Sequence, residues 1–158
     1  MPLDSTTISA IRVEPVNPDG LTSGDAGLRR FDAMWRSHAR RGRLPAMDHI
    51  DPAEVAALID RLLLVEVDGT PGRRRFRAVV VGDAHRVDPR LDPVGLEIGD
   101  EWMPACEPHA AHEAMTAAAI TGMPHRGGSQ VAYPLSSNGR DIDSVICLTT
   151  QGPTANAA

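Results

Sequence analysis

The sequence predicts an α+β domain in which helices cover one face of an antiparallel sheet. Segments with a helical spacing of apolar residues come first, and two pairs of strand-like segments follow, separated by one long helical segment. A short turn joins the two members of each pair, which is typical of antiparallel hairpins. Because each element has an apolar face to bury, we expect the helices to form a layer on the sheet.

Two helices are predicted before the first strand. Leu28, Phe31 and Trp35 recur at the spacing of one helical face, and Asp25 or Ser23 is placed to cap the start of this helix. The run Asp51-Pro-Ala-Glu54 begins the second helix, because proline at the first helical position loses only an amide proton that had no partner. We therefore expect an N-terminal helix and a short second helix ahead of the sheet.

The strands follow in two hairpins on either side of a long helix. The Ala-rich helix has Ala111, Met115 and Ala118 on its predicted inner face, and residues 82–104 are broken by proline and glycine into loops or short helices. Whether a separate strand forms near 125–129 is left open. The expected hairpins are 62–67 with 74–81 and 130–135 with 143–150, and the expected helix is 107–121.

Length and charge limit the classes of function. The chain has 158 residues, enough for one domain, which we place at 25–150 between a flexible segment (1–24) and a disordered tail (151–158). The formal net charge of −5 argues against nucleic acid as a partner. Two cysteines and no apolar run near the ~20 residues that span a bilayer favour a reduced cytoplasmic location away from the membrane.

Arginines form two clusters, at 36–43 and at 73–77. Clusters of this kind are typical of solvated surfaces, and a local contact with an anion is the alternative.

The order of elements and several local motifs resemble bacterial PAS-like domains over Leu28 to about Thr150. The resemblance implies a five-stranded antiparallel sheet with helices on one face and an N-terminal helix. It also implies a stand-alone sensory or protein-interaction domain that binds a ligand or dimerises and is not an enzyme. The motifs are Gly42-Arg-Leu-Pro45, Asp51-Pro-Ala-Glu54, Phe76-Arg77, Val81-Gly82, Thr121-Gly-Met-Pro124 and Tyr133-Pro-Leu-Ser136.

A ligand pocket is expected between the sheet and the helices of residues 82–121; the alternative is a filled core made of the same side chains. Domains of this kind often pair through a helix before the sheet, so Phe31 and Trp35 are either core residues or contacts of a homodimer. A signalling protein is a further expected partner. The residues expected to line the pocket are Phe76, Ala78, Val80, Trp102, Met115 and Tyr133.

No metal or resident cofactor is predicted, but one cluster of residues is a candidate metal site. Cys106, His109 and His112 are three residues apart, so a thiolate and two imidazoles can share one helical face and meet a metal ion. Exposure of these side chains to solvent is the alternative. A haem or metal sensor using His109 or His112 therefore remains an alternative function. A small enzyme of the ketosteroid-isomerase-like α+β fold, with an aspartate as base, is another.

Overall fold

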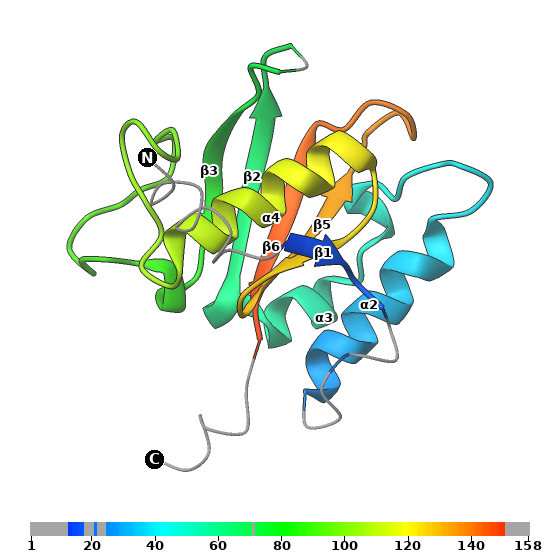
Figure 1. Cartoon of the computed structure of the whole chain (residues 1–158). Coiled ribbons are helices and arrows are strands. Elements are labelled where there is room, and N and C mark those ends of the chain that lie inside the picture. Colours follow the sequence, from blue (N-terminus) through cyan, green and yellow to red (C-terminus); the bar gives the residue numbers. More distant parts are fainter. Residues whose placement is uncertain (1–12, 18–20, 22–24, 71, 151–158) are drawn as a thin grey trace, which may run out of the picture.

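The computed structural model describes residues 13–17, 21, 25–70 and 72–150; the rest of the expected N-terminal segment and the expected tail at 151–158 lie outside the described residues. Six strands form one sheet in the order β1-β4-β5-β6-β2-β3, and every neighbouring pair is antiparallel (Figure 1). The α+β class is thus confirmed, with six strands in place of the expected five. The strands are β1 (Val13–Pro15), β2 (Leu62–Asp68), β3 (Arg75–Val81), β4 (His125–Gly127), β5 (Gln130–Leu135) and β6 (Ser144–Thr149).

Two helices begin at the capping residues that the sequence predicted. Asp25 caps α2 (Ala26–His38) by accepting a hydrogen bond from the amide of Leu28, at 3.2 Å. Asp51 caps α3 (Pro52–Ala57) by accepting from the amide of Ala53, at 2.9 Å. The long helix is α4 (Pro108–Thr121), and single 3₁₀ turns form η2 (Met47–His49), η3 (Ile59–Arg61) and η4 (Asp83–His85). None of the described helices is both long and apolar enough to cross a bilayer.

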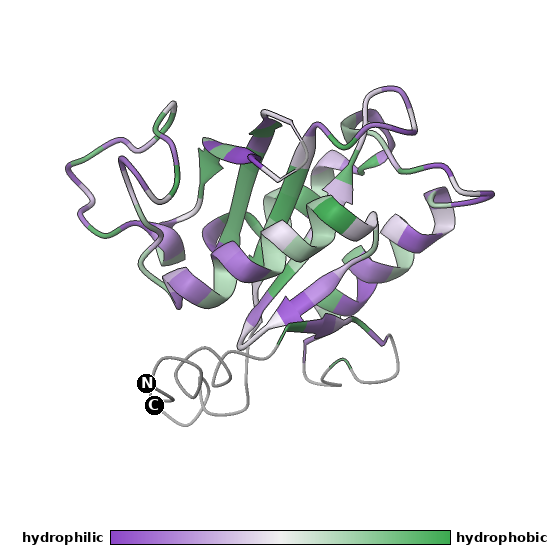
Figure 2. Ribbon diagram, turned by 45° about the horizontal axis from the view of Figure 1, so that its top comes forward, coloured by the Kyte–Doolittle hydropathy of each residue, from purple (hydrophilic) through white to green (hydrophobic). Residues whose placement is uncertain are grey.

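Helices cover both faces of the sheet, so the expectation of a single covered face is wrong. Neighbouring residues of a strand point to opposite faces, and in β5 Ala132 packs under α4 whereas Tyr133 packs under α2. All six residues of β5 are buried, which requires an apolar cover on each side. Figure 2 shows the central strands mostly hydrophobic and the loops at both ends of the sheet largely hydrophilic.

A β-bulge changes which side chains of β3 face α4. Leu64 pairs with Val80, but the next residue, Val65, pairs with Ala78, so Val79 is left over. Beyond this extra residue, the alternation of β3 side chains between the two faces of the sheet is reversed. Ala78 therefore packs in the cluster under α4, and Val80 packs against the opposite cluster.

Polar contacts as well as apolar packing hold α2 on its face of the sheet. The Trp35 indole N–H donates to the carbonyl oxygen of Pro134 at 2.8 Å, and the Tyr133 hydroxyl donates to Asp32 Oδ1 at 2.8 Å. The second oxygen of Asp32 accepts from Arg36 Nε at 2.7 Å. Burial, with the Asp32 carboxylate nearby, raises the pKa of Tyr133, so the hydroxyl keeps its proton as a donor. The C-terminal end of α2 is thereby placed beside the β5–β6 loop.

Candidate functional site

The six residues expected to line one pocket are divided between the two faces. Phe76, Ala78 and Met115 pack together in the core under α4, where each is 1% exposed or less, and Trp102 packs against them. Val80 and Tyr133 lie with the cluster on the opposite face. The bulge at Val79 directs the Val80 side chain to the face opposite α4. Tyr133 belongs to β5, which is buried on both faces, and its side chain is on the face covered by α2. The six residues therefore do not surround one space.

Phe31 and Trp35, the expected dimer contacts, lie inside the core of one chain. They are 0% and 2% exposed, and the ring of Phe31 meets that of Tyr133 edge-on with centroids 5.0 Å apart. A contact between two chains through these side chains would require α2 to leave the sheet.

The three candidate metal ligands are near the start of α4 but have different surroundings. Cys106 is half-buried before the helix, and His109 is exposed. The ring of His112 packs edge-on against Phe76, with centroids 5.6 Å apart. Among the residues that the structure describes, no group of three or more His, Cys, Asp and Glu side chains is arranged to hold a metal ion.

A buried polar cluster joins η4 to the sheet, and the sequence analysis missed it. His85 Nε2 lies 3.1 Å from the carbonyl oxygen of Arg61 and 3.3 Å from Thr149 Oγ1, and Thr149 Oγ1 donates to Gln130 Oε1 at 3.1 Å. Burial lowers the pKa of His85, which favours the neutral ring. Burial, with Cys106 nearby, raises the pKa of Cys147 to about 12, so this thiol is unreactive.

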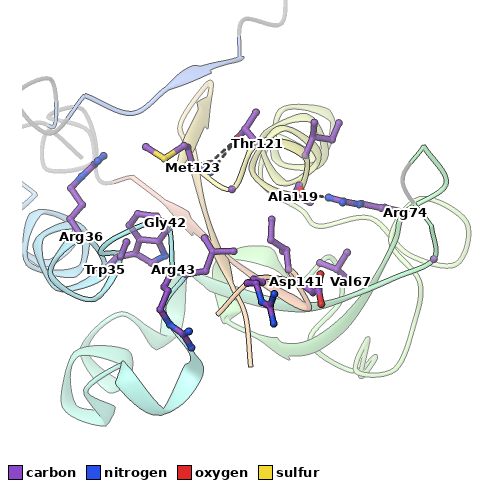
Figure 3. Close-up of a pocket in the computed structure, with 17 residues that line it drawn as sticks. Trp35, Arg36, Gly42, Arg43, Val67, Arg74, Ala119, Thr121, Met123 and Asp141 are labelled. Carbon is purple, nitrogen blue, oxygen red and sulfur yellow. Dashed lines mark hydrogen bonds between the residues drawn. The ribbon is translucent and has the colours of Figure 1, made fainter. Parts of the chain in front are cut away.

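The main pocket is at the end of the sheet where the C-terminal ends of α2 and α4 approach the β2–β3 and β5–β6 loops (Figure 3). Its volume is about 810 Å³, within the range of small-molecule sites. The lining comes from α2 and the loop after it (Trp35, Arg36, Ala39, Gly42, Arg43, Leu44), the β2–β3 hairpin (Val67, Gly69, Arg74), the end of α4 (Ala119, Ile120, Thr121, Gly122, Met123) and the β5–β6 loop (Arg140, Asp141, Ile142).

The surface of this pocket is partly apolar. Leu44, Val67 and Ile142 are half-buried in it, and Ile120 and Met123 at its rim are 66% and 48% exposed. Large apolar side chains exposed beside a recess are a common feature of binding sites.

Four arginines line the same pocket, and Asp141 is the one carboxylate among the described lining residues. Arg36 is held by Asp32 and by the carbonyl oxygen of Val16, at 3.0 Å, and Arg74 donates to the carbonyl oxygen of Ala119. Two of the four come from the cluster at 36–43 and one from the cluster at 73–77, so the basic clusters were the sequence signal for this site. Sequence spacing alone did not show that they converge.

The chemistry of this lining favours binding. A guanidinium group stays protonated in proteins and donates up to five N–H groups, so it attracts and orients an anion but does not accept a proton as a base. Comparison of the chain with protein-family models, with curated proteins and with solved structures finds no match.

Proposed function

We propose that this chain is a sensory or protein-interaction domain of the PAS type, which acts by binding a small ligand and not by catalysis. The observation that carries this proposal is the pocket of about 810 Å³ with a mixed apolar and cationic lining. Its volume and residue types suit recognition of a small molecule.

The connectivity of the sheet supports the PAS-type part of the proposal. Five of its strands follow the order β4-β5-β6-β2-β3, so the first and last strands of this set, β2 and β6, are central neighbours. The long helix α4 makes the connection between the two outer strands β3 and β4. This arrangement agrees with a five-stranded PAS-like sheet to which β1 adds a sixth strand beside β4.

The position of the pocket supports a sensory role. Its walls come from α2 and α4, which pack on opposite faces of the sheet, and from two loops at the end of the sheet. A ligand in this pocket contacts both helices at once. Its binding free energy therefore stabilises this relative position of α2 and α4 over other positions of the two helices. A homodimer or a signalling partner that contacts α2 would then respond to occupancy.

Thermal unfolding with a panel of anionic, neutral and cationic amphiphiles tests the proposal. Met123→Trp fills the rim of the pocket, and Val94→Trp is its control, because both residues are 48% exposed and Val94 lies outside the pocket lining. We expect at least one compound to raise the melting temperature of the wild type and of Val94→Trp but not that of Met123→Trp. Failure of the whole panel, or equal stabilisation of Met123→Trp, would contradict ligand binding at this pocket.

A further inference from the structure

We propose that the ligand is an amphipathic organic anion, with one carboxylate or a comparable acidic group on an apolar chain of several carbons. This inference rests on the proposed function, because it names the ligand class of the same pocket. Three features of the described residues support it: the convergence of cations, the two arginines with spare donors, and the apolar surface beside them.

The cations come from four separate segments. Arg36 is on α2, Arg43 follows that helix, Arg74 is in the β2–β3 hairpin and Arg140 is in the β5–β6 loop. Permanent positive charges that gather around one recess repel each other, and an anion placed among them relieves that repulsion. Asp32 pairs with Arg36 at 2.7 Å, and Asp141, which already accepts from Asn138 Nδ2 at 2.9 Å, offsets part of the remaining charge.

The C-terminal end of α4 adds a partial negative charge to the pocket, which must be weighed against the arginines. Several of its last carbonyl groups already have donors. The amide of Gly122 donates to Ala118 at 2.9 Å, the Thr121 hydroxyl donates to Ala117 at 2.8 Å, and Arg74 donates to Ala119. Part of the helix end is therefore satisfied, and the partial charge of a helix C-terminus, about half an elementary charge, is smaller than the charge of one guanidinium group.

Arg43 and Arg140 are the two exposed arginines of the pocket lining, and both have donors to spare. The Arg43 guanidinium packs against Gly139, so closely that a Cβ at 139 would lie 2.6 Å from Nη2, and it donates to the carbonyl oxygen of Asn138 at 3.3 Å. The amide of Leu44 also donates to the Gly139 carbonyl, at 2.9 Å, which joins the two loops. The exposed Arg140 side chain makes no hydrogen bond or ion pair with any residue in the described part of the chain. The acidic group is assigned to this pair.

The apolar chain is assigned to the surface formed by Leu44, Val67 and Ile142, with Ile120 and Met123 at the rim. An acidic group alone would leave this surface in water. A chain of several carbons covers it and gains the free energy of removing both apolar surfaces from water. An apolar molecule without a charge would instead leave the arginines without a new partner.

Isothermal titration at neutral pH with octanoate, octan-1-ol, octylamine and sodium phosphate separates these contributions. The first three probes share one carbon chain and differ in charge, and phosphate has charge without a chain. We expect octanoate to bind most tightly and octan-1-ol about tenfold to a hundredfold more weakly, with octylamine and phosphate weaker still. Added sodium chloride should weaken octanoate binding and leave octan-1-ol binding unchanged.

Arg43→Gln and Arg140→Gln should weaken octanoate binding toward the affinity of octan-1-ol, without changing the affinity for octan-1-ol. Arg29→Gln is the matched control, because Arg29 is an exposed arginine of α2 outside the pocket lining. Equal binding of octanoate and octan-1-ol, tighter binding of octylamine, or octanoate binding that survives both substitutions would overturn the ligand class but keep the pocket as a binding site. Binding of none of the four probes would overturn this inference, whereas the proposed function fails only when the broader panel also fails or stabilises Met123→Trp equally.

Discussion

Removal of a single oxygen atom from Tyr133 tests how α2 is held on the sheet. The Tyr133 side chain is 0% exposed, and its hydroxyl donates to Asp32 Oδ1 at 2.8 Å. Asp32 is 2% exposed, and its other oxygen accepts from Arg36 Nε at 2.7 Å. In Tyr133→Phe the buried carboxylate therefore loses one of these two donors and keeps the other.

The expected loss follows from the charge of the acceptor. A hydrogen bond to a charged group contributes about 1.5–3 kcal/mol to stability, and the loss is larger when a buried partner is left with no donor. Because Arg36 still pairs with Asp32, we expect the lower half of that range, a decrease of about 2 kcal/mol in the free energy of unfolding. Such a decrease is a large part of the stability of a typical domain.

Urea unfolding followed by circular dichroism measures this decrease, with Asp32→Ala and the double variant completing a double-mutant cycle. In the Asp32→Ala background the Tyr133 hydroxyl has already lost its acceptor, so its removal should cost little. A loss below about 0.5 kcal/mol in the wild-type background, or equal losses in both backgrounds, would refute the assigned role of this hydrogen bond.

Two further predictions concern the backbone near η3 and the buried histidine. Gly82→Ala should lower the free energy of unfolding by about 3 kcal/mol, since its Cβ would lie 2.1 Å from the Ile59 carbonyl oxygen. Gly42 has a φ of +75°, but a Cβ added there would have no atom within 4 Å, so Gly42→Ala should lower the free energy of unfolding by only about 1 kcal/mol. Equal losses for Gly42→Ala and Gly82→Ala in urea unfolding would contradict this prediction. Burial lowers the pKa of His85 from 6.5, so near and below this pH the folded chain binds fewer protons than the unfolded chain. The contribution of the neutral His85 ring to the free energy of unfolding should therefore be fully present above pH 6.5 and decrease as the pH falls below 6.5. Urea midpoints for wild type and His85→Gln over this pH range check the prediction, and equal slopes in the two proteins would contradict it.

The elements that follow local rules were predicted closely. Asp25 and Asp51 cap the helices predicted for them, and Ala111, Met115 and Ala118 are among the five buried residues of α4. Capping and helical spacing depend on residues within about one or two turns of each other, so they can be read from a short stretch of chain.

The faces of the strands were predicted less well, because burial on both sides removes the alternation of apolar and polar residues. In β5 both Ala132 and Tyr133 are 0% exposed, so their side chains give no sign of which helix covers each. The extra residue Val79 reversed the alternation in β3, and a bulge of this kind depends on the pairing with β2.

The candidate site likewise combines features that depend on sequence neighbours with features that depend on tertiary packing. The helices, the two hairpins and the two clusters of arginine could be predicted from the sequence, since each depends on neighbours along the chain. That Arg36, Arg43, Arg74 and Arg140 line one pocket, and that helices cover both faces of the sheet, became clear only from the folded chain. These residues belong to segments far apart in sequence, so their convergence depends on long-range strand pairing and on the packing of α2 and α4.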